Sequence, residues 1–254
     1  MPYRQSGSEN PMWYSYDAGP VHVLGLVGSY APTGSDSPQY LFAEEDLRRA
    51  DRARTPWIVV QFHTPWYNSN RRHYQEAFKH QQDMEDLFYR HGVDVVFNGH
   101  VHSYERSRPV YRNKVDPCGA VHIVIGDAGN YEGPALPWVE PQPEWSAVRE
   151  SAFGSGLLTV HNAVRAEWAW HRAACAYRGP PNGDRTWWYA TTWKGNSSCS
   201  TQSDNSGQRS SPADVVAIVR DLEACPNRAA PRPAVAASWW SWLLIGSAAA
   251  AAWL

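Results

Sequence analysis

The sequence predicts an α/β fold, and three observations carry that prediction. Residues 57–62 and 93–97 are apolar runs rich in β-branched side chains, which is the composition of buried strands. A helical pattern fills residues 74–91 between them, so the two strands are expected to be parallel neighbours joined by a crossover helix. Both strands end in turns that carry histidine, at the sheet edge where α/β proteins usually bind ligands.

The composition narrows the class of protein. The 254 residues are enough to bury a core, and a net charge of −2 gives no reason to expect nucleic acid as a partner. The even number of cysteines, together with a glycosylation sequon at Asn196, favours a secreted protein. Three pairings remain open for the four cysteines, which are Cys118, Cys175, Cys199 and Cys225.

The first third of the chain is predicted to supply an edge strand, a buried strand and a helix. Residues 1–20 are mostly loop, with aromatic and polar residues alternating as in an edge strand. Residues 21–27 form an apolar run typical of a strand. Residues 40–53 carry apolar side chains at helical spacing, and Thr55-Pro56 ends the pattern. Strand 57–62 follows.

The remaining elements are shorter. Residues 120–125 predict another strand, and residues 157–160 and 166–171 predict a hairpin. Residues 178–233 then change to Pro, Gly, Ser and Asn, which favours a low-order extension whose one regular element is a helix at 214–223.

The last 21 residues, 234–254, carry no charge. A stretch of that length is sufficient for a transmembrane helix, which needs about 20 apolar residues. It would also serve as the cleaved tail of a lipid-anchor signal. Membrane association through this tail is therefore an expectation.

Three histidines converge in the predicted topology. His63 follows strand 57–62, and His100 and His102 follow strand 93–97 after Gly99, which is expected to let the backbone turn sharply. Because the carboxyl ends of parallel strands share one sheet edge, we expect the three side chains to lie together. Neutral imidazole is a good ligand for zinc, iron and manganese, so the trio predicts a metal site.

Two segments carry a close resemblance to a known family. Residues 60–69 (VQFHTPWYNS) and 99–106 (GHVHSYER) resemble the last two metal motifs of the purple acid phosphatases, which are binuclear enzymes of the calcineurin-like metallophosphoesterase superfamily. Residues 126–133 and 141–150 also resemble the plant-type members. The resemblance covers about residues 1–172.

This resemblance implies a fold and a domain organisation. Residues 1–177 are expected to form the carboxyl-terminal half of a four-layer αββα sandwich with mixed sheets. Residues 178–233 would be the extension and 234–254 the apolar tail. Three of the five metal motifs of the family would precede Met1, so the chain is expected to be a fragment or a truncated gene product.

The resemblance also implies roles for individual residues. His63 and His100 would bind a divalent ion, zinc or manganese, and His102 would bind iron. His73 would protonate the leaving alkoxide, and Arg72 stands where the family has a first histidine facing the phosphate. The substrate would then contact Arg72, His100, Val101 and His102.

The implied activity is that of an acid phosphatase acting on phosphate monoesters. Two alternatives stay open on sequence alone: a non-catalytic remnant that binds at most one metal ion, and a phosphodiesterase or pyrophosphatase of the same superfamily. The family also implies a secreted, cell-surface or vacuolar location and a homodimer.

Overall fold

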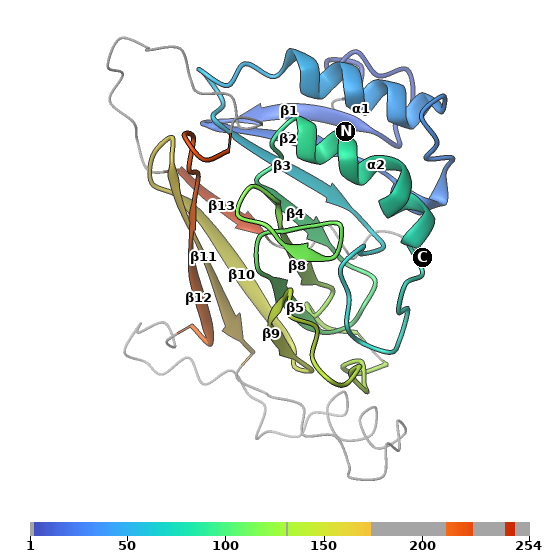
Figure 1. The fold of residues 1–254 in the computed structure, drawn as a ribbon, viewed down its shortest axis with the longest axis vertical. Coiled ribbons are helices and arrows are strands. Elements are labelled where there is room, and N and C mark those ends of the chain that lie inside the picture. The colour runs from blue at the N-terminus through green and yellow to red at the C-terminus, as the bar shows by residue number, and fades with distance from the viewer. Residues whose placement is uncertain (1–2, 131, 174–211, 226–241, 247–254) are drawn as a thin grey trace.

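The structure is a computed structural model that describes residues 3–130, 132–173, 212–225 and 242–246. These residues form three layers: two helices, a seven-stranded sheet and a four-stranded sheet (Figure 1). The predicted α/β class is confirmed, and the layers correspond to three of the four expected in an αββα sandwich.

The seven-stranded sheet is mixed and contains the predicted crossover. Its order is β1-β2-β3-β4-β8-β5-β9, and β2, β3, β4 and β8 run parallel. The strands are β1 (Tyr14–Ala18), β2 (Val21–Gly25), β3 (Trp57–Phe62), β4 (Val95–Asn98), β5 (Tyr104–Ser107), β8 (Val121–Ile125) and β9 (Ser146–Glu150). The edge position of β1 agrees with the alternating aromatic residues that predicted an edge strand.

The second sheet is antiparallel throughout its described strands, in the order β12-β11-β10-β13. Its strands are β10 (Gly154–Val160), β11 (Arg165–Arg172), β12 (Asp214–Val219) and β13 (Trp242–Gly246). The hairpin β10–β11 is the one that the sequence predicts. A short hairpin of β6 (Val110–Tyr111) and β7 (Lys114–Val115) lies outside both sheets.

The two helices cover one face of the seven-stranded sheet (Figure 1). Helix α1 (Pro38–Arg49) begins where the Ser37 hydroxyl accepts a hydrogen bond from the backbone N–H of Tyr40, and it ends earlier than predicted. Helix α2 (Phe78–Arg90) begins later than predicted. Residues 74–77 form turns instead, because His73 and Gln75 have left-handed backbones, with φ of 59° and 58°.

Two apolar cores lie on opposite faces of the seven-stranded sheet, as the alternation of β3 requires. Ile58 and Val60 pack beneath the helices, whereas Trp57 and Val59 face the second sheet. Trp168 lies fully buried in the same inter-sheet core. Aromatic side chains of this size dominate the burial of apolar surface.

The helix predicted at residues 214–223 is wrong. Asp214–Val219 forms β12, which pairs with β11 and sets Val216 opposite Trp168. A disulfide between Cys118 and Cys225 joins the next turn to the loop before β8, which settles one of the open pairings. Residues 214–225 are therefore part of the packed fold and not of a low-order extension.

The described part of the apolar tail is strand β13, which pairs antiparallel with β10. Within the described ranges, no helix combines the length and the apolar character needed to cross a bilayer. Asn196, Cys175 and Cys199 lie outside the described residues, as does most of the tail.

Candidate active site

Two neighbouring parallel strands deliver His63 and His100 to one point. Strand β3 pairs with β4 up to Phe62 opposite Asn98, and the side-chain amide of Asn98 donates a 2.9 Å hydrogen bond to the Phe62 carbonyl. The N–H of Gly99 then donates to the His63 carbonyl at 2.9 Å. As a result, Nε2 of His63 and Nδ1 of His100 lie 3.0 Å apart.

The turn after β4 is tight and closely packed. The backbone does turn sharply here, and its left-handed residue is His100, with a φ of 64°. The N–H of Val101 donates to the Gly99 carbonyl at 2.7 Å. Gly126, at the end of β8, lies so close that a Cβ there would be 2.3 Å from the Val101 carbonyl oxygen. Such left-handed non-glycine residues are costly and cluster at functional sites.

His102 lies on the other side of the turn. Its Nδ1 is 3.4 Å from a carboxylate oxygen of Glu132, and its carbonyl accepts a 2.7 Å hydrogen bond from the N–H of Ala135. The charge of His102 also acts on the pKa of His63. His102 is thus an electrostatic neighbour of the other predicted metal ligands.

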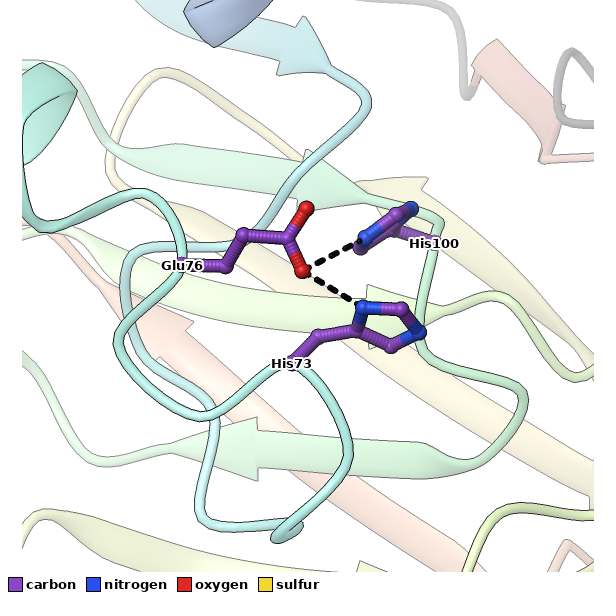
Figure 2. Close-up of side chains that lie close together, drawn as sticks. All are labelled: His73, Glu76 and His100. Carbon is purple, nitrogen blue, oxygen red and sulfur yellow. Dashed lines mark hydrogen bonds and ion pairs between the residues drawn. The ribbon is translucent and has the colours of Figure 1, made fainter.

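His73 reaches the same place from the loop that follows β3. Its ring centroid is 4.0 Å from that of His100, and both rings contact Glu76 (Figure 2). His73, Glu76 and His100 are the one group of metal-capable side chains in the described ranges whose ligand atoms all lie within 4.8 Å of one another. The predicted trio of His63, His100 and His102 does not form such a group.

Glu76 was not among the residues that the sequence predicted for the site. The available signal was its spacing, His-x-x-Glu from His73, but the helix predicted from residue 74 concealed it. Residues three positions apart share a face in a helix. Here no helix forms, and the left-handed turns at His73 and Gln75 bring the side chains of His73 and Glu76 together instead.

The two other residues predicted to contact the substrate are Arg72, which is half-buried, and Val101. The N–H of Arg72 donates to the Asn70 side chain at 3.0 Å, and its carbonyl accepts from the Asn68 amide at 3.0 Å. The side chain of Val101 is fully buried. The roles of Arg72 and Val101 in substrate binding remain predictions.

The electrostatics of the site favour neutral imidazoles. Burial lowers the pKa of His63, His100 and His102, and the positive charges of neighbouring histidines lower it further. Burial alone would raise the pKa of Glu76, but hydrogen bonds from His73 and His100 outweigh it and lower that pKa. The cluster therefore offers free nitrogen lone pairs beside an ionised carboxylate.

Buried polar groups support the site from behind. Glu105 accepts hydrogen bonds from the hydroxyls of Ser69 and Ser146, at 2.5 and 2.6 Å. Arg106 forms a two-pronged pair with Asp214. These contacts fix the strand that leaves the histidine turn.

Two further polar residues near the site, Asp127 and Asn130, make structural contacts. Asp127 is buried and accepts a 2.8 Å hydrogen bond from the Trp170 indole, and burial raises its pKa to about 7. Asn130 accepts a hydrogen bond from the N–H of Glu132, as in a local turn.

Comparison with known families gives two sequence matches. Residues 11–104 match a family described as calcineurin-like phosphoesterase. Residues 119–178 match one described as iron/zinc purple acid phosphatase-like protein C.

Curated relatives agree with these matches. Purple acid phosphatase 18 and purple acid phosphatase 21 of Arabidopsis thaliana are 49% and 50% identical to the chain over 172 residues, which is 68% of this chain and 39% of each relative. A purple acid phosphatase of Glycine max is 40% identical over 183 residues. The chain therefore spans about two fifths of the length of these relatives.

A solved structure supports the fold. Purple acid phosphatase PPD1 from yellow lupin (Lupinus luteus) seeds superimposes with a TM-score of 0.65, over 91% of this chain and 37% of that one. At 21% sequence identity this likeness concerns the fold alone.

Proposed function

Because the chain belongs to the purple acid phosphatase family of calcineurin-like phosphoesterases, we propose that it forms part of a site that hydrolyses phosphate monoesters. One observation carries the proposal: adjacent parallel strands bring His63 and His100 together at 3.0 Å, at the carboxyl edge of the sheet.

The residues present fit a metal ion. His63 and His100 turn two nitrogens toward each other, and their lowered pKa values leave both rings able to act as neutral ligands. We assign these two histidines to a divalent ion, zinc or manganese, and His102 to iron, following the family. A bound ion would supply Lewis-acid stabilisation of charge on the phosphoryl group.

The remaining chemistry falls to side chains of the loop before α2. His73, whose ring lies against His100, would donate a proton to the leaving alkoxide as a general acid. Arg72 adjoins it in the chain and would hold the phosphate by charge, because a guanidinium keeps its proton.

The test is release of phosphate from 4-nitrophenyl phosphate by the protein that contains this chain. His100→Ala should lower turnover at least about 100-fold, since it removes a ligand and a neighbour of the acid. His161→Ala, which changes an exposed histidine, is the matched control. Equal turnover in the wild type and His100→Ala would contradict the proposal, and zinc binding without turnover would favour the single-metal remnant.

We also propose an oxidising compartment for the protein, either secreted, at the cell surface or vacuolar. The Cys118–Cys225 disulfide supports this location, because such bonds persist mainly outside the cytosol. A shift in gel mobility on treatment with a glycosidase, lost in Asn196→Gln, would test the associated glycosylation. The homodimer and membrane association through residues 234–254 remain predictions, which light scattering and vesicle flotation would check.

A further inference from the structure

One carboxylate oxygen stands between two site histidines. Oε2 of Glu76 is 2.5 Å from Nδ1 of His73 and 3.2 Å from Nε2 of His100 (Figure 2). The two contacts come from different elements, because His73 and Glu76 lie before α2 and His100 follows β4. The oxygen therefore links the loop that carries the predicted acid to the turn that carries a predicted metal ligand.

An ionised carboxylate can only accept hydrogen bonds, so each nitrogen that faces it must carry a hydrogen. His100 is then protonated at Nε2, and its lone pair lies on Nδ1, the atom that faces His63. His73 is correspondingly protonated at Nδ1, which leaves Nε2 as the atom that exchanges a proton. Carboxylates that orient metal-binding histidines in this way are a common device.

We propose that Glu76 is a positioning residue, which holds His100 in the tautomer that binds metal through Nδ1 and His73 in the tautomer that exchanges protons through Nε2. This inference rests on the proposed function for the meaning of the two roles. The contacts themselves require only the residues of this chain.

The backbone supports such a role. His73, Gln75 and His100 all have left-handed backbones, with φ between 58° and 64°. The N–H of Glu76 donates to the His73 carbonyl at 3.2 Å, which closes the turn that points both side chains the same way. Left-handed non-glycine residues persist where surrounding structure requires them, and here they lie on both sides of one contact.

A rival reading treats Glu76 as a metal ligand itself, with His73 and His100 beside it, since their ligand atoms all lie within 4.8 Å. The two readings differ in what the loss of the carboxylate does. The loss of a positioning residue lowers metal affinity by about 10- to 100-fold and releases the histidines from a single tautomer. Loss of a direct ligand from a three-residue site removes the site.

The experiment compares wild type, Glu76→Ala, Glu76→Gln and the control Asp83→Asn, which changes a nearby carboxylate on α2 that accepts a hydrogen bond from Thr33 instead of from a site histidine. Long-range proton–nitrogen spectra of the metal-free protein, labelled at histidine nitrogens, report the tautomers. We expect single tautomers for His73 and His100 in wild type and in Asp83→Asn. In Glu76→Ala both should become mixtures, and Glu76→Gln should keep part of the wild-type pattern because its amide oxygen still accepts.

Zinc affinity, measured by competition with a chromophoric chelator, is the second readout. We expect a loss of about 10- to 100-fold in Glu76→Ala, an intermediate loss in Glu76→Gln and none in Asp83→Asn. Unchanged tautomers or unchanged affinity in Glu76→Ala would overturn the inference, and complete loss of binding in both Glu76 variants would overturn it in favour of direct ligation. Neither readout needs turnover, so an inactive protein would contradict the proposed function and leave this inference to its own test.

Discussion

Asp214 accepts hydrogen bonds from both Nε and Nη2 of Arg106, at 2.7 and 3.0 Å, across 108 residues of chain. Both side chains are buried, and the hydroxyl of Tyr104 donates to the same carboxylate at 2.6 Å. Arg106 lies four residues beyond His102. Asp214 of β12 therefore anchors the second sheet to β5, the strand that follows the histidine turn.

Asp214→Ala should lower the free energy of unfolding by about 3–5 kcal/mol, because it leaves a buried guanidinium and a buried hydroxyl without their partner. Urea denaturation at neutral pH measures this. Glu45→Ala, which removes an exposed pair with Arg48, should leave the urea midpoint unchanged. A loss below about 1 kcal/mol for Asp214→Ala would show that the bridge contributes little.

Gly126→Ala should disturb the histidine turn directly. The new Cβ would meet the backbone of Val101, which has no flexible end to move aside. We expect a loss of about 1–3 kcal/mol in stability, together with a fall in zinc affinity as His100 shifts. Gly34→Ala is the control, since its new Cβ would meet only the side chain of Asp36. Normal zinc affinity in Gly126→Ala would contradict the prediction that the packing of Gly126 against Val101 positions His100.

His22 predicts a dependence of stability on pH. The ring is buried between Asp17 on β1 and Asp46 on α1, with both ring nitrogens 2.8 Å from a carboxylate oxygen. Burial alone would lower the pKa of His22, but the two hydrogen bonds and negative charges together raise it. Arg54 pairs with Asp17, and the Ser15 hydroxyl donates to Asp46, so these groups complete the surroundings.

The pKa of His22 is raised in the native state. Its contribution to the free energy of unfolding is therefore complete below the unfolded pKa of about 6.5, and it is lost as pH rises through the native pKa. The pKa of Asp17 is lowered, so its contribution is lost only toward strong acid. We therefore expect thermal stability to decline above about pH 6.5, and the decline to be smaller in His22→Gln. His161→Gln, at an exposed position, should follow the wild-type curve; a parallel decline in His22→Gln would refute the assignment.

Reduction of the Cys118–Cys225 disulfide should lower stability by about 2–4 kcal/mol, because the bond closes a loop of more than 100 residues in the unfolded chain. Thermal melts with and without a phosphine reductant measure this. The double variant Cys118→Ser/Cys225→Ser should melt at the temperature of the reduced wild type, both with and without the reductant. Equal melting of oxidised and reduced wild type would contradict the prediction.

The parts of the fold that the sequence predicts well are those whose local pattern and long-range packing agree. Strand β3 has the predicted bounds, because its apolar run is buried on both faces. Strand β5 was not predicted, because Glu105 and Arg106 are charged residues whose place in a strand depends on distant partners. In β12, apolar side chains fit helical spacing as well as a strand, and pairing with β11 decided the outcome.

The site likewise contains residues whose positions the sequence predicts and residues whose positions it does not. The parallel crossover was sufficient to predict that His63 and His100 meet, since it follows from strand order alone. The position of Glu76 depends on left-handed turns at His73 and Gln75, which are non-glycine residues that rarely adopt them. Residue propensities do not predict such turns at histidine or glutamine, because the turns depend on the surrounding packing.

The long reach of the carboxyl-terminal contacts has a consequence for biosynthesis. Asp214 joins Arg106, Arg220 joins the buried Asp94 just before β4, and Cys225 joins Cys118, over separations of 108, 126 and 107 residues. A nascent chain leaves the ribosome amino end first. The histidines are therefore synthesised well before the groups that brace their sheet, so the final packing of the histidine turn has to wait until more than 100 further residues have been added.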